Sequence, residues 1–118
     1  GYHAFADAEL AQREAAGFPP FAHLALMRAE AQQVDAAQAF LLAARQVLRD
    51  HDPTLEIHGP LPAPMPRRAG YHRVQLVLSS PERRQLHRLL DAAVPQLYAL
   101  PEARRVRWSL DVDPLDLY

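Results

Sequence analysis

The placement of the prolines limits most strongly how this chain can fold. Of eleven prolines in 118 residues, four fall within residues 59–70, GPLPAPMPRRAG. Proline has no backbone N–H and cannot pair in the interior of a sheet, so we predict a stiff loop here. Two further prolines, Pro19-Pro20, end a predicted helix over residues 4–16. We expect this helix to be an appendage that packs on another part of a protein and not on the core of this domain.

Between these breaks, the spacing of apolar residues predicts four strands and two amphipathic helices. The strands are expected over residues 21–31, 55–57, 71–79 and 105–112. The helices are expected over residues 36–50, with Asp35 as N-cap, and after Ser80, which is the second expected N-cap. The order βαββαβ with right-handed crossovers predicts an α+β fold, a split βαβ sheet with both helices on one face and the other face open.

Composition excludes several kinds of chemistry. The chain contains no cysteine and no lysine, which removes thiol nucleophiles, thiolate zinc sites, the P-loop lysine and Schiff-base catalysis. No apolar run approaches the roughly 18 residues of a membrane span. Asp111, Asp113 and Asp116 suggest a cation site less strongly than an acidic tail. We therefore expect a soluble, cytoplasmic, non-catalytic domain with no metal and no cofactor of its own.

The net charge of −1 conceals a basic segment. Residues 1–59 contain four arginines and eight acidic residues. Residues 60–110 contain nine arginines and three acidic residues, and residues 111–118 contain three acidic residues and no arginine. The basic segment predicts either a face that binds nucleic acid phosphates or ordinary solvated arginines on one helix and one strand.

Two arginine groups are candidate binding sites. Arg67, Arg68 and Arg73 surround Tyr71, and such a group suits phosphate binding and base stacking, although a solvated hairpin connection explains it equally well. Arg83 and Arg84 are expected in the first turn of the second helix, where the helix dipole disfavours cations. They indicate either an anionic docking site or two exposed arginines.

Four ordered motifs give the chain a resemblance to a known family. They are YxxF at residues 2–5, RxxxGxPPF at 13–21, GPxPAPMxRRxG at 59–70 and VxWxLDVDP at 106–114. Together they resemble the C-terminal domain of the PriA family, the bacterial replication-restart helicases also called primosomal protein N′. The resemblance covers essentially the whole chain, but this sequence lacks the lysines that relatives mix with arginine.

The resemblance implies a domain organisation and a setting. Residues 1–18 correspond to a linker helix from an upstream helicase lobe, and residues 19–118 to the C-terminal DNA-binding domain. The family's 3′ to 5′ helicase acts at stalled forks and D-loops and begins primosome assembly. ATP, magnesium and zinc are expected only in its upstream lobes, so this fragment is expected to need no cofactor.

The resemblance also implies partners and residue roles. The partners are branched, single-stranded and double-stranded DNA, the acidic tail of single-stranded DNA-binding protein, primosome proteins and the upstream helicase lobes, in the cytoplasm near the nucleoid. The family's loop arginines correspond to Arg67 and Arg68, and its tail-binding arginine to Arg83 or, one residue on, Arg84. Two functions follow: a DNA-binding module using Arg67, Arg68, Tyr71 and Arg73, or mainly a protein-interaction domain that braces the lobes and docks the tail.

Overall fold

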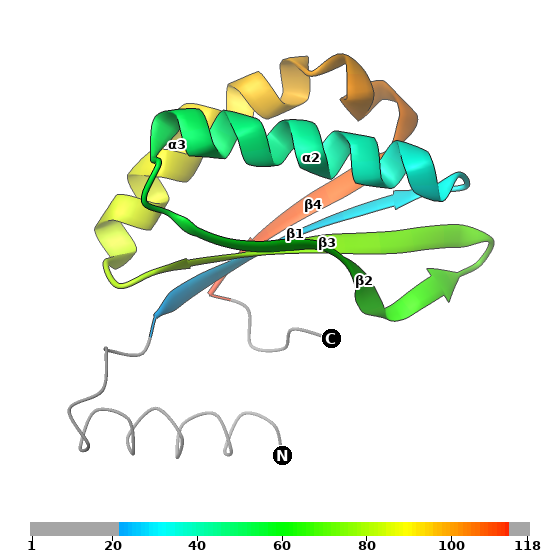
Figure 1. Ribbon diagram of the computed structural model, residues 1–118, viewed down its shortest axis with the longest axis horizontal. Helices are drawn as coiled ribbons and strands as arrows, with labels where there is room; N and C mark the ends of the chain where they lie inside the picture. The colour runs from blue at the N-terminus through cyan, green and yellow to red at the C-terminus, as the bar shows by residue number, and fades with distance from the viewer. Residues whose placement is uncertain (1–21, 114–118) are drawn as a thin grey trace.

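The computed structural model describes residues 22–113 as a four-stranded sheet with two helices on one face (Figure 1). In chain order the elements are β1 (His23–Ala31), α2 (Val34–His51), β2 (Glu56–Arg68), β3 (Tyr71–Ser80), α3 (Arg83–Ala99), the 3₁₀ helix η1 (Pro101–Arg105) and β4 (Arg107–Val112). The strand order is β2-β3-β1-β4, with neighbouring strands antiparallel. The predicted α+β class, element order and one-sided helices are confirmed.

Two further expectations concern a linker helix and membrane-spanning segments. The linker helix expected over residues 1–18 lies outside the described residues. Within residues 22–113, no helix combines the length and the apolar character that a membrane crossing requires.

The core lies between the sheet and the two helices. The buried residues recur every three or four positions on each helix, which is why both helices pack one side on the sheet. On α2 they are Ala37, Phe40, Leu41, Ala44 and Leu48, and on α3 they are Leu86, Leu89, Leu90, Ala93 and Leu97. On the sheet, Met27, Leu76 and Leu78 are fully buried against them, and the half-buried Trp108 of β4 lies 5.5 Å from Phe40 between ring centroids.

Both predicted N-caps are wrong. The N-cap of α2 is Gln33 and that of α3 is Glu82, and neither makes a capping hydrogen bond through its side chain. Ser80 cannot begin a helix because it still pairs with His23 in the sheet. Its hydroxyl instead accepts a hydrogen bond from the Glu82 N–H at 3.2 Å, in the turn that precedes the helix.

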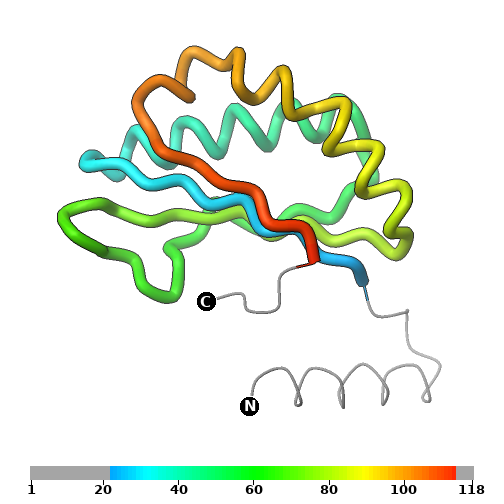
Figure 2. The backbone as a smooth tube through the Cα atoms, turned by 180° about the vertical axis from the view of Figure 1, so that it is seen from behind, coloured from blue at the N-terminus to red at the C-terminus, as the bar shows by residue number. Residues whose placement is uncertain are grey.

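The proline segment, predicted as a loop, belongs to β2. Since β2 is an edge strand that pairs only with β3, its prolines are tolerated without breaking a ladder on both sides. Pairing is interrupted between His58 and Leu61 and again between Pro62 and Arg67. At the second interruption, residues 63–66 of β2 have no register partner, and only one β3 residue, at position 73, lies between the flanking pairs. The strand bends away from the helices there (Figures 1 and 2). We call residues 59–70 the proline arm.

The arm folds over a buried arginine on the helix-free face of the sheet. Arg73, on β3, is 6% exposed. Its Nε donates to Glu30 Oε1 at 3.1 Å and its Nη1 donates to the Met65 carbonyl at 3.0 Å. The neighbouring Gln75 is also buried and accepts a hydrogen bond from Arg28. The face predicted to be open is therefore covered where the arm lies.

A tight turn closes the arm. Ala69 and Gly70 connect the last paired residues, Arg68 and Tyr71, and both have positive φ, 51° and 84°. Two consecutive positive φ values are typical of the two-residue hairpin turn whose twist matches that of the strands. The turn holds Arg68 and Tyr71 on facing strands at the tip of the arm.

We predict that the start of the arm is sensitive to an added methyl group. At Gly59, φ is +116° and a Cβ would lie 2.6 Å from the Gln75 carbonyl oxygen, so Gly59→Ala should lower the free energy of unfolding by about 1–3 kcal/mol. Gly70→Ala is the matched control, because a Cβ there meets nothing within 4 Å, and it should cost about 1 kcal/mol. Urea unfolding followed by circular dichroism measures both. Equal losses would contradict the close approach at Gly59.

A second prediction concerns the buried ion pair. Arg73→Met leaves Glu30 and the Met65 carbonyl without their donor, so we expect a loss of about 2 kcal/mol, moderated by the partial exposure of Glu30. The double variant Arg73→Met/Glu30→Met removes both charges and should recover part of that loss. Urea unfolding of the two variants gives the comparison. A double variant no more stable than the single one would show that the pair does not act as a unit.

Candidate nucleic-acid interface

The arginines of the described region divide into those used within the fold and those left at the surface. Arg45 donates to the Gly59 carbonyl at 3.0 Å, Arg49 donates to the Leu55 carbonyl, and Arg73 holds the arm. These contacts fasten β2 to α2 and to the sheet. The side chains of six exposed arginines make no ion pair and no hydrogen bond within residues 22–113: Arg67, Arg68, Arg84, Arg88, Arg104 and Arg105.

The strand register gathers several basic residues at one end of the sheet. Arg67 pairs with His72 and Arg68 pairs with Tyr71 at the tip of the arm. His72 in turn pairs with Ala31 of β1, and the adjacent Glu30 pairs with Arg107 of β4. The arm tip, the end of β1 and the start of β4 are therefore neighbours. We call this the arm end of the sheet.

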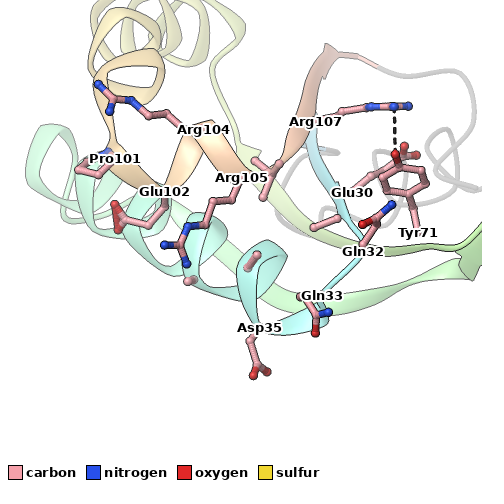
Figure 3. A pocket seen from close by; sticks show the side chains of 14 residues that line it. Glu30, Gln32, Gln33, Asp35, Tyr71, Pro101, Glu102, Arg104, Arg105 and Arg107 are labelled. Atoms are coloured by element: carbon pink, nitrogen blue, oxygen red, sulfur yellow. Dashed lines mark hydrogen bonds between the residues drawn. The ribbon is translucent and has the colours of Figure 1, made fainter.

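Tyr71 and Arg107 are in direct contact at the arm end (Figure 3). The Arg107 guanidinium carbon lies 4.6 Å from the centroid of the Tyr71 ring, and Nη2 donates to the hydroxyl at 3.1 Å. The tyrosine is half-buried and the arginine is exposed. A guanidinium stacked on an aromatic ring keeps its edge available to an anion while its position is fixed.

Of the four residues predicted to contact DNA, three lie together at the surface. Arg67 and Arg68 are exposed and Tyr71 is adjacent to them on the facing strand. The fourth, Arg73, is two residues along β3 but is buried, with its guanidinium occupied by Glu30 and Met65. The alternation of side chains along β3 puts Arg73 on the helix-free face of the sheet. The arm covers the side chain there and so buries it.

Sequence reasoning did not connect Arg104, Arg105 and Arg107 with the arm. They lie on η1 and at the start of β4, and Arg107 is 36 positions from the tyrosine that it contacts. The last strand was expected to begin at residue 105, but it begins only at Arg107. The contact of Arg107 with Tyr71 depends on the register of β1 with both β3 and β4, which no local pattern shows, and Arg104 and Arg105 line the same groove as Tyr71.

Arg83 and Arg84 lie at the opposite end of the sheet, in the first turn of α3, which contains no acidic residue. Arg83 is exposed, and its Nε lies 3.4 Å from Asp113 Oδ2 and 3.4 Å from His87 Nε2. The other carboxylate oxygen of Asp113 lies 3.6 Å from His23 Nδ1. Asp113 thus supplies a negative charge beside a first turn that contains none.

The two arginine groups are far apart. Tyr71 and Ser80 mark the two ends of β3, a ten-residue strand, which at roughly 3.4 Å per residue separates them by about 30 Å. A small ligand cannot contact both groups at once. The arm end and the start of α3 are therefore two sites.

The acidic residues near the end of β4 do not form a metal site with others in the described region. Within residues 22–113, no three histidine, aspartate or glutamate side chains are placed to hold a metal ion. Asp113 is held by its own backbone, whose N–H donates to the Leu24 carbonyl at 2.7 Å. The third carboxylate considered, Asp116, lies outside the described residues.

Comparison with known structures supports the fold alone. The de novo designed protein Foldit4 matches with a TM-score of 0.57 at 10% sequence identity, covering 79% of this chain and 97% of the designed one. Identity at this level shows shared architecture and gives no information on function.

Comparison with known sequences identifies the family. The family model for the primosomal protein N C-terminal domain matches residues 14–115. Replication restart protein PriA of Haemophilus influenzae is 39% identical over 118 residues, covering 99% of this chain and 16% of the relative. Replication restart protein PriA of Synechocystis sp. is 32% identical over 124 residues, covering 98% of this chain and 14% of the relative. The chain therefore spans only a small part of these relatives, and it belongs to the family of primosomal protein N (PriA) C-terminal domains.

Proposed function

We propose that this domain binds DNA with the arm end of its sheet and contributes to the recognition of branched DNA, such as stalled forks and D-loops, during replication restart. The observation that carries the proposal is the pair of exposed guanidiniums of Arg67 and Arg68, which make no ion pair or hydrogen bond within residues 22–113. Guanidiniums bind phosphate oxygens in a bidentate manner. A tip closed by a two-residue turn loses less conformational freedom on binding than a mobile loop would.

The proposal gives each predicted residue a role. Arg67 and Arg68 contact backbone phosphates, and Tyr71, held by Arg107, offers a ring against which an unpaired base can stack. Arg73 is a positioning residue, because both of its contacts are made within the domain. We assign no catalytic step to this domain. The ATP-driven 3′ to 5′ helicase activity and zinc sites implied by the family would belong to other parts of a longer, cytoplasmic protein.

The first functional prediction concerns the arm tip. Arg67→Ala/Arg68→Ala should weaken binding to forked DNA about tenfold at moderate salt and reduce the salt-dependence slope by about 2, because two phosphate contacts are lost. The loss should be the same for forks of different sequence, since phosphates carry no sequence information. Fluorescence anisotropy over a series of salt concentrations measures both quantities.

The matched control is Arg88→Glu, which changes the net charge by the same amount. Arg88 is exposed on α3 and makes no ion pair within residues 22–113. We expect the affinity of the Arg88→Glu variant for the fork to stay within about twofold of that of the wild type, because long-range charge is screened at moderate salt. If the double variant binds as tightly as this control, the arm tip is not the DNA contact.

A second candidate function is supported by the contact between Arg83 and Asp113. We propose that the start of α3 docks an acidic peptide, such as the tail of single-stranded DNA-binding protein, while the domain also braces the helicase lobes and takes part in primosome assembly. The supporting observation is that the exposed Arg83 guanidinium is paired with a carboxylate at 3.4 Å. An incoming carboxylate would replace Asp113 at that position, and Arg84, exposed beside it, would add charge.

The corresponding prediction compares the two arginines. Arg83→Glu should weaken binding of an acidic tail peptide about tenfold, because an attractive charge is replaced by a repulsive one. Arg84→Glu, the neighbouring change of equal charge, should have a smaller effect if Arg83 is the principal contact. Peptide titration followed by anisotropy provides the measurement. Equal peptide affinity of the wild type and Arg83→Glu would exclude this docking site.

A further inference from the structure

A broad groove of about 1170 Å³ lies beside the Tyr71–Arg107 contact (Figure 3). One wall is formed by η1 and the start of β4, and the other by the β1–α2 connection and the beginning of α2; between them β1 and β4 are paired neighbours, so Glu30 lies beside Arg107. Tyr71 lies at the margin of the groove next to the arm. None of the groove residues other than Tyr71 was assigned a binding role from the sequence.

The two walls differ in chemistry. The wall of η1 and β4 carries three exposed arginines, Arg104, Arg105 and Arg107. The wall of the β1–α2 connection and α2 carries no cation and presents amides and a carboxylate. Figure 3 shows the arginines and these groups coming from different elements around the groove. The hydrogen-bonding wall consists of Gln32, Gln33 and Asp35.

The acidic residues lining the groove do not cancel the basic wall. Glu30 is already paired with the buried Arg73 at 3.1 Å. Asp35 lies on the opposite wall, in the first turn of α2, where the helix dipole favours a carboxylate. Glu102 lies on η1 itself but makes no ion pair with Arg104 or Arg105. The arginines therefore retain their charge for an incoming anion.

We propose that this groove binds one unpaired DNA strand, with its phosphates on the arginine wall and its base edges on the amide and carboxylate wall. The proposal deepens the proposed function, since it rests on the arm end being the DNA-binding end. Amide side chains donate to and accept from base edges, and carboxylates accept from the exocyclic amino groups of cytosine, adenine and guanine. Tyr71 provides a stacking surface where the strand leaves the groove toward the arm.

The asymmetry of the groove favours a single strand over a duplex. A duplex pairs its Watson–Crick edges internally and presents phosphates on both sides, so one of its backbones would face the carboxylate of Asp35. Like charges brought together in this way cost affinity. A single strand separates its phosphate edge from its base edge, which matches the separation of the two walls. Arg67 and Arg68 of the arm contact phosphates alone and make no such distinction.

The test compares Arg104→Ala/Arg105→Ala with the wild type on a labelled single-stranded oligonucleotide and on the blunt duplex of the same sequence. We expect single-strand affinity to fall about tenfold, with a salt slope lower by about 1.4 for two lost phosphates, while duplex affinity changes less than about twofold. Gln32→Ala/Gln33→Ala should also weaken single-strand binding but leave the salt slope unchanged, because these residues contact bases. Fluorescence anisotropy measures all of these values.

The control Arg88→Glu has the same change of charge as Arg104→Ala/Arg105→Ala and should leave single-strand affinity near that of the wild type. The groove proposal is overturned if the double arginine variant binds the single strand as tightly as this control, if it loses single-strand and duplex affinity equally, or if the wild type does not bind the single strand. Measuring Arg67→Ala/Arg68→Ala on the fork in the same series tests the arm separately. If Arg67→Ala/Arg68→Ala weakens fork binding while Arg104→Ala/Arg105→Ala has no effect on single-strand binding, the proposed function stands and the groove proposal is rejected.

Discussion

The buried guanidinium of Arg73 determines where the proline arm lies. An edge strand with several prolines forms few ladder hydrogen bonds, and β2 loses register twice along its length. Arg73 compensates by donating to the Met65 carbonyl within the longer interruption, and Glu30 of β1 balances its charge. The arm tip is thereby fixed relative to the two central strands, so its exposed arginines project from a defined position rather than from a mobile loop.

The periodic elements of the fold were predictable and the arm was not. Apolar spacing on two helices and alternation on the strands depend on local sequence, and the α+β class follows from their order. The proline rule excludes a sheet interior but does not show which strand lies at an edge, so residues 59–70 were predicted as a loop. The N-cap expected at Ser80 failed for a similar reason, since its pairing with His23 is non-local.

The candidate site was predictable in the same partial way. Arg67, Arg68 and Tyr71 lie within five residues of sequence and their grouping needs no tertiary information. That Arg104, Arg105 and Arg107 belong to the same site can be seen only when the register of three strands is known. That Arg73 is buried can be seen only when the fold of the arm is known. The separation of Arg83 from this group by the length of β3 makes the two proposed functions compatible within one domain, because DNA bound at the arm end would leave the start of α3 open.

The central claim is that DNA contacts the arm end of the sheet and not the start of α3. Amide chemical-shift changes across the labelled chain, recorded by NMR during titration with forked DNA, test it most directly. We expect changes concentrated at residues 67–72 and 104–107, with little change at residues 83–88. The largest changes at residues 83–88, or changes of equal size throughout residues 22–113, would contradict it.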